Sequence, residues 1–108
     1  MKTFAPRQET DFGPLEIYVD VNEARMLALV DTGAQMDTMS YAALERTGLR
    51  PKQRLYSYEL ILGNDKVPDE GRVTQETPEL TLTYQGRTQK RKFDLINFTK
   101  HDILLGLL

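Results

Sequence analysis

The residues best suited to chemistry lie where an apolar run ends in a carboxylate. Asp31 directly follows the apolar residues 28–30, and Thr32 and Gly33 come next. An ionised carboxylate in apolar surroundings is costly unless it is paired or hydrogen-bonded, so this position indicates a functional group. An ordinary strand-ending turn, in which Asp31 accepts backbone hydrogen bonds, would place the same three residues here. Because a three-residue motif often occurs by chance, the motif alone does not decide between the two interpretations.

Few other residues have catalytic or metal-binding potential. The 108 residues include no Cys and one His, which excludes thiolate nucleophiles, thiolate zinc sites and disulfides. A serine triad of His101 with Ser40 or Ser57 is disfavoured, because neither serine has the sequence of a nucleophile elbow. We expect His101 to be a surface histidine in a turn. No metal and no cofactor are expected.

Length and charge limit the possible partners. A chain of 108 residues supports a single domain with one core. With 14 Lys and Arg against 16 Asp and Glu, the net charge of -2 argues against a nucleic-acid partner. No apolar run approaches the roughly 18 residues that cross a bilayer, which argues against a membrane partner. We therefore expect a soluble, cytoplasmic protein.

Hydrophobic periodicity predicts a small, mostly antiparallel β domain over residues 15–108, preceded by a flexible N-terminal arm at 1–14. Alternating residues predict a first strand at 15–21, and an apolar run predicts a central strand at 25–30. The other expected strands are 56–62, 66–74, 80–84, 88–96 and 102–105. The cations between Arg87 and Lys92 are interpreted as a solvated edge strand. One short helix is expected at 41–47, with Ser40 as its N-cap and Gly48 at its end.

Several segments together resemble a known family. Residues 28–49 (ALVDTGAQMDTMSYAALERTGL) resemble the active-site segment of retroviral-type aspartic proteases, the retropepsins, and especially that of gypsy-type retrotransposon proteases and the DNA-damage-inducible protease family. Residues 63–71 lie where that family carries its flap, and residues 71–82 resemble the strand that leaves the flap. Residues 101–107 (HDILLGL) resemble the second signature, a hydrophobic pair followed by Gly. The resemblance covers most of the chain in the family's order.

The resemblance implies a small closed β-barrel with one short helix, which forms half of a two-fold symmetric aspartic protease. Such chemistry needs two carboxylates that share one proton, and the chain has a single Asp-Thr-Gly, so a homodimer is expected in which Asp31 of both chains meet. One Asp31 would take a proton from the attacking water, while its protonated partner polarises the peptide carbonyl.

The resemblance also implies the other site residues. Thr32 and Gly33 would support the active-site loop. The residues expected to bind substrate are Ala34, Gln35, Met36, Leu62, Gly63, Asn64 and Leu104. Core packing is an alternative role for Met36 and Leu104. The expected substrate is an extended polypeptide, the polyprotein of a retroelement, and the enzyme could then act within retroelement particles.

Two departures from the family leave alternatives open. Asn64 and Asp65 replace the glycine-rich flap tip, and the chain stops at Leu108, where family members continue through a short helix. We therefore expect a truncated C-terminal end. One alternative is a retropepsin-like domain that binds peptide or dimerises with little or no proteolytic activity. The other is an unrelated small β-barrel interaction module.

Overall fold

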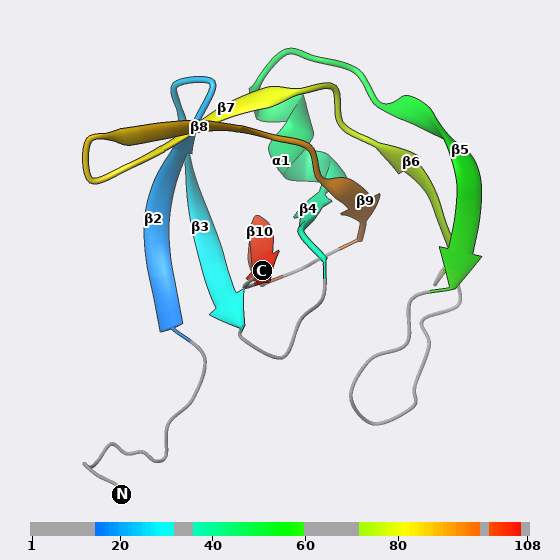
Figure 1. Cartoon of the computed structure of the whole chain (residues 1–108), viewed down its shortest axis with the longest axis horizontal. Coiled ribbons are helices and arrows are strands. Elements are labelled where there is room, and N and C mark those ends of the chain that lie inside the picture. The colour runs from blue at the N-terminus through cyan, green and yellow to red at the C-terminus, as the bar shows by residue number, and fades with distance from the viewer. Residues whose placement is uncertain (1–14, 32–35, 60–71, 98–99, 107–108) are drawn as a thin grey trace, which may run out of the picture.

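A computed structural model describes residues 15–31, 36–59, 72–97 and 100–106 as one β-rich domain (Figure 1). The elements in chain order are β2 (Leu15–Val21), β3 (Ala24–Asp31), β4 (Thr38–Ser40), α1 (Tyr41–Arg46), β5 (Lys52–Glu59), β6 (Arg72–Glu76), β7 (Leu80–Tyr84), β8 (Arg87–Arg91), β9 (Asp94–Ile96) and β10 (Ile103–Gly106). The strands form one sheet in the order β5-β6-β9-β4-β10-β3-β2-β7-β8, which confirms the mostly β class. Among the described residues no helix is long and apolar enough to span a membrane. The expected arm at 1–14 lies outside them.

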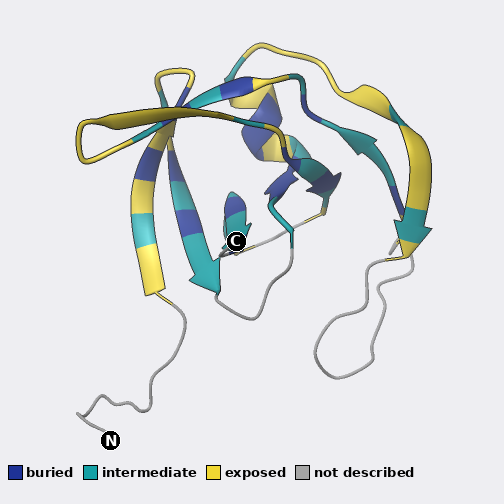
Figure 2. Ribbon diagram, in the orientation of Figure 1, coloured by how far each residue is buried: buried dark blue, intermediate teal, exposed yellow. Residues whose placement is uncertain are grey.

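The core lies on one face of this sheet, where apolar residues on neighbouring strands are opposite one another. The row runs through Ile17, Ala28, Ile103, Met39 and Leu95, on β2, β3, β10, β4 and β9. The last four of these residues are buried. Because side chains alternate between faces along a strand, the residues next to this row point to the opposite face. Buried residues thus alternate with partly exposed ones along β3, as the colours of Figure 2 show.

The helix forms where the sequence predicts it. Ser40 has an extended backbone (φ -75°, ψ 151°), and its Oγ accepts a hydrogen bond from the Ala43 amide at 3.0 Å. This satisfies one of the free N–H groups of the first turn. Beyond the last helical residue, Gly48 has φ +79°, a conformation that favours glycine. Ala43 and Leu44 are buried, so one side of α1 packs into the core.

The expected hairpin at 56–74 is confirmed at its base. Strands β5 and β6 pair antiparallel, with Tyr58 opposite Val73. The expected turn at 63–65 lies outside the described residues. The two other turns are present: Asn22 and Glu23 link β2 to β3, and Gln85 with Gly86 links β7 to β8.

The strand expected at 88–96 is in fact two strands, β8 and β9. Phe93 lies between them and is buried. Its backbone N–H donates to the Thr77 hydroxyl oxygen at 3.0 Å, and its carbonyl accepts a hydrogen bond from the Thr77 amide at 2.8 Å. This turns the chain so that β8 pairs with β7, whereas β9 pairs with β4 and β6. Strand β4 was not predicted, because three residues show no periodicity. Two pairs, β3 with β10 and β4 with β9, are parallel.

The prediction of a closed barrel is wrong for the described part of the chain, where the strands form a curved but open sheet. Its edge strands are β5 and β8, which lie on opposite sides of the molecule and do not pair with each other (Figure 1). Most of β8 is exposed, including Arg87 and Lys90, and charged side chains oppose the pairing that closure would need (Figure 2). This also confirms the interpretation of the cationic segment as a solvated edge strand.

Asp102 fastens α1 to the strands. Its Oδ2 accepts a hydrogen bond from the Leu27 amide at 2.8 Å, and the Arg46 guanidinium donates to both carboxylate oxygens, at 3.2 and 3.1 Å. Burial alone would raise the pKa of Asp102, but the hydrogen bonds from Arg46 and Leu27, with the positive charge of Arg46, outweigh it and lower the pKa below the usual carboxyl value. The folded protein therefore stabilises the ionised form.

We predict that Asp102→Ala lowers the free energy of unfolding by about 2 kcal/mol near neutral pH, mainly because the Leu27 amide loses its acceptor. Arg46 is too exposed for the ion pair to add much. Since the pKa is lower in the folded state, the part of this contribution that depends on the ionised carboxylate is present above the unfolded pKa of about 3.9 and is lost as the pH falls through the folded pKa. Urea denaturation across that range measures it.

Asp20→Ala is the matched control, because Asp20 is an exposed carboxylate on β2. We expect its effect to stay within about 0.5 kcal/mol. Equal losses for the two variants, or a loss at Asp102 that does not shrink in acid, would contradict the assigned role.

Candidate active site

Asp31 is the last residue of β3 and is half-buried. On one side β10 runs parallel to β3 and places Gly106 opposite Asp31. On the other side the pairing with β2 ends at Leu15 opposite Val30, so Asp31 extends past the start of β2. The sheet therefore holds the backbone of Asp31 on its β10 side at the point where β3 ends.

The face of the sheet that carries Asp31 is the one opposite the core. Leu29, Leu104, Thr38 and Asp94 stand in register on β3, β10, β4 and β9, next to the buried row. Asp31 lies two residues beyond Leu29 and so shares its face. Leu104 is half-buried here rather than packed in the core. Of the residues expected to bind substrate, the structure thus brings Leu104 to the face of Asp31, and its binding role stays a prediction.

Met36 is the other described residue that was expected to bind substrate. It lies near Asp94, at the end of the row that is far from Leu29. Its Sδ is 2.8 Å from the hydroxyl oxygen of Tyr58, and the same hydroxyl hydrogen-bonds to Asp94. The remaining predicted site residues lie outside the described part of the chain: Thr32, Gly33, Ala34, Gln35, Leu62, Gly63 and Asn64.

Asp37 organises the site, although sequence reasoning did not single it out. Its Oδ1 accepts a hydrogen bond from the Gly106 amide at 2.9 Å, and its Oδ2 pairs with Arg91 at 2.5 Å. Its backbone carbonyl accepts a hydrogen bond from the Asp94 amide at 3.0 Å. Asp37 therefore joins β8, β9 and β10 beside the end of β3. No local pattern marks it, since the side-chain partners are 54 and 69 residues away along the chain.

The serine triad that the sequence disfavoured gains no support. His101 is not the surface residue that we expected: its side chain is only 11% exposed, and its Nε2 lies 2.5 Å from Glu16 Oε2. The Ser40 hydroxyl caps α1, and the Ser57 hydroxyl accepts a hydrogen bond from Arg72. Strand β10 begins just after His101 and brings this residue against β2, a contact between distant segments that the local sequence does not reveal. Within the described ranges no group of three or more His, Asp or Glu side chains could hold a metal ion.

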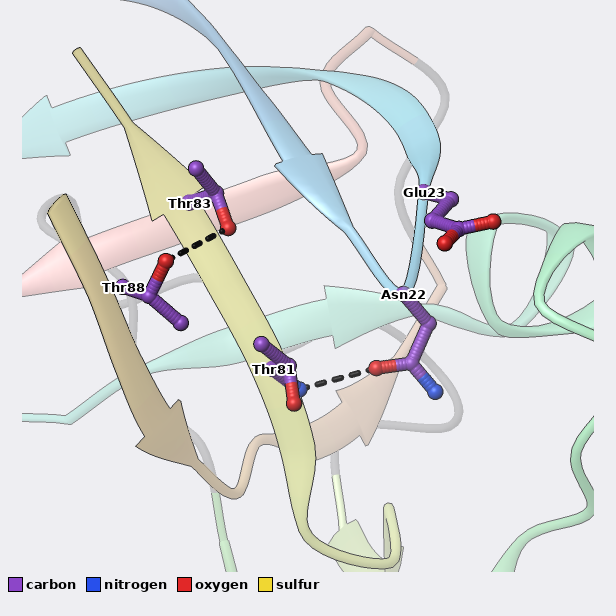
Figure 3. Close-up of a pocket in the computed structure, with 5 residues that line it drawn as sticks. All are labelled: Asn22, Glu23, Thr81, Thr83 and Thr88. Atoms are coloured by element: carbon purple, nitrogen blue, oxygen red, sulfur yellow. Dashed lines mark hydrogen bonds between the residues drawn. The ribbon is translucent and has the colours of Figure 1, made fainter. Parts of the chain in front are cut away.

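A polar cavity of about 490 Å³ lies away from Asp31, at the turn between β2 and β3 (Figure 3). It is lined by Asn22, Glu23, Thr81, Thr83 and Thr88. The Asn22 side chain accepts a hydrogen bond from the Thr81 amide, and the Thr83 and Thr88 hydroxyls bond to each other. These contacts join the β2–β3 turn to β7 and β8. The whole of β3 separates this cavity from Asp31, so it is not part of the candidate active site.

The comparisons with known proteins decide the family. The family model of the PEG10/RTL1 protease domain matches residues 27–108, most of the chain. The chain belongs to this family. A PEG10/RTL1 protease domain is of the gypsy-derived, retropepsin-like aspartic protease type, which confirms the resemblance seen in the sequence. No curated protein matches the chain.

Solved structures show the same fold. EIAV protease, in complex with the inhibitor HBY-793, is 22% identical with a TM-score of 0.59, and the match covers 92% of this chain and 86% of that one. The retroviral protease-like domain of Ddi1 from Leishmania major is 20% identical with a TM-score of 0.60, covering 88% and 70%. A retropepsin-like aspartic protease from Rickettsia conorii is 19% identical with a TM-score of 0.55, covering 93% and 69%. At these identities the likeness shows a shared fold and nothing more.

We predict that Asp37→Ala increases the hydrogen-exchange rate of the Gly106 amide by about tenfold or more, because this buried donor loses its acceptor. Exchange followed by NMR measures the effect residue by residue. Asp37→Asn is the matched control, since its amide oxygen can still accept the bond while the charge that pairs with Arg91 is removed. Unchanged protection of Gly106 in the Ala variant would show that Asp37 does not hold β10.

Proposed function

We propose that this protease domain is an aspartic endopeptidase that works as a homodimer and cleaves extended polypeptide at a site formed by two copies of Asp31. The observation that carries the proposal is the Asp-Thr-Gly segment at the end of β3, with Gly106 of the second signature opposite Asp31. The family match supports the same activity. An intact catalytic segment favours an enzyme over a domain that only binds peptide.

The chemistry requires the dimer. Two carboxylates about 3 Å apart cannot both be ionised, so they share one proton. The ionised Asp31 takes a proton from water, which attacks the peptide carbonyl, and the protonated Asp31 donates a hydrogen bond to the carbonyl oxygen. Each chain contributes one Asp-Thr-Gly, so the active site needs two chains.

The proposed substrate is the polyprotein of a retroelement, cleaved in the cytoplasm or within retroelement particles. An extended peptide is recognised through backbone hydrogen bonds and through pockets for alternate side chains. Leu29 and Leu104 stand side by side on the face that carries Asp31, and both are half-buried. They offer an apolar surface for a substrate side chain beside the scissile bond.

We predict that Asp31→Asn abolishes peptide cleavage while the protein stays folded, because the amide keeps the shape of the carboxylate but cannot take up the proton. Cleavage of a panel of polyprotein-derived peptides by purified protein, followed by mass spectrometry, measures the activity. Circular dichroism and a thermal unfolding curve check the fold.

Asp20→Asn is the matched control and should cleave as the wild type does, since Asp20 is exposed on β2. Equal turnover by the Asp31 variant would end the catalytic assignment. A folded wild type that binds these peptides without cleaving them would identify a peptide-binding domain instead.

We predict that specific activity rises with protein concentration, because dissociation separates the two Asp31 carboxylates and destroys every active site. A dilution series, run beside analytical ultracentrifugation, should show activity that follows the dimer fraction. Constant specific activity in a sample shown to be monomeric would rule out the homodimeric site.

A further inference from the structure

Tyr58 makes an unusual pair of contacts for a tyrosine near the end of a sheet-edge strand. It lies on β5, and its hydroxyl reaches both the Asp94 carboxylate on β9 and the Met36 sulfur beside the active-site loop. Met36 is one of the residues expected to contact substrate. The phenol therefore connects an edge of the sheet to a side chain of the proposed substrate site.

The hydroxyl has one proton, and its direction follows from the acceptors. A carboxylate is a far stronger acceptor than a thioether, so the hydroxyl donates to Asp94 and its oxygen lies against Met36 Sδ at 2.8 Å. Burial, together with the hydrogen bond to Asp94 and its charge, raises the pKa of Tyr58 well above the usual value. The hydroxyl therefore stays protonated near neutral pH.

Asp94 is itself held in place from two directions. Arg54 donates to its other oxygen at 2.6 Å, and the Arg54 guanidinium lies over the Tyr58 ring, 5.1 Å from its centroid. The backbone amide of Asp94 donates a hydrogen bond to the Asp37 carbonyl at 3.0 Å. This links Asp94 to the residue whose side chain binds the Gly106 amide. Tyr58 is thus fixed by a charged cluster on β5 and β9 that is linked to Asp37.

A methionine can select among substrates only if the conformation of its side chain is restricted. Its side chain has three rotatable bonds and adapts readily to different neighbours, so a free methionine makes a permissive pocket wall. The Tyr58 hydroxyl oxygen packs closely against the Met36 sulfur and so limits, by steric contact, the positions open to the end of that side chain. A restrained wall accepts an apolar side chain of one size better than others.

We propose that Tyr58, positioned by Asp94 and Arg54, restrains Met36 and so determines the size of the apolar substrate side chain that Met36 contacts. Tyr58 is a positioning residue, since it acts through Met36. The inference rests on the proposed function, because selectivity requires cleavage.

The test compares Tyr58→Phe with Tyr56→Phe. Both changes remove one hydroxyl from β5, but Tyr56 is 75% exposed and serves as the control. The probes are variants of one peptide that the wild type cleaves, with Ala, Val, Leu or Phe at each position flanking the scissile bond, and Met36→Ala identifies the position that contacts Met36. At that position we expect Tyr58→Phe to reduce the ratio of kcat/KM between the best and worst side chain by about tenfold. The Tyr56 variant should keep the wild-type ratio.

A second measurement does not depend on activity. In protein labelled with ¹³C at the methionine methyl groups, four methionines give separate signals, and Met36→Leu identifies that of Met36. Tyr58→Phe should shift and broaden this signal, whereas Tyr56→Phe should leave it unchanged.

The outcomes separate the two proposals. An unchanged Met36 signal in Tyr58→Phe, or an unchanged selectivity ratio in an active enzyme, overturns the role of Tyr58. A wild type that cleaves none of the peptides overturns the proposed function and the selectivity role with it, while the Met36 signal still shows whether Tyr58 restrains that side chain.

Discussion

The hydrogen bond from the Gly106 amide to the Asp37 carboxylate is the contact on which the arrangement around Asp31 depends. Strand β10 has four residues and lies between β3 and β4, so few backbone bonds hold it. Asp37 adds a charged acceptor at its C-terminal end, where Gly106 stands opposite Asp31. A hydrogen bond to a charged group is stronger than one between neutral groups, and Arg91 balances the charge. The carboxylate thus fixes the strand that borders Asp31.

One face of the sheet contributes to the hydrophobic core, and the opposite face carries Asp31. Ala28, Ile103 and Met39 face the core, whereas Leu29 and Leu104, which follow the first two along their strands, lie half-buried on the opposite face. A change on the second face can alter what the site accepts without opening a cavity in the core. Asp94 ends this second row, and its carboxylate makes the row polar at the end far from Asp31.

Much of the fold followed from the sequence because local physics determines it. Alternation along β2 and the Ser40 cap of α1 need only near neighbours, and both were predicted. The open sheet, the short β4 and the break at Phe93 were not, because they depend on pairing between distant strands. The same distinction holds for the site. Asp31 is visible as a charge at the end of an apolar run, whereas Asp37 and Tyr58 have partners that only the folded chain brings near.

The parallel pairing of β3 with β10 also has a consequence for synthesis. Leu27 and Asp102, which bond where these strands begin to pair, are 75 residues apart in sequence. A ribosome makes the chain from its N-terminus, so Asp31 is complete long before the strand that borders it exists. The polypeptide under synthesis therefore contains Asp31 before β10 has paired with β3. Any activity that depends on this arrangement can therefore begin only after the last strand of the domain has been made.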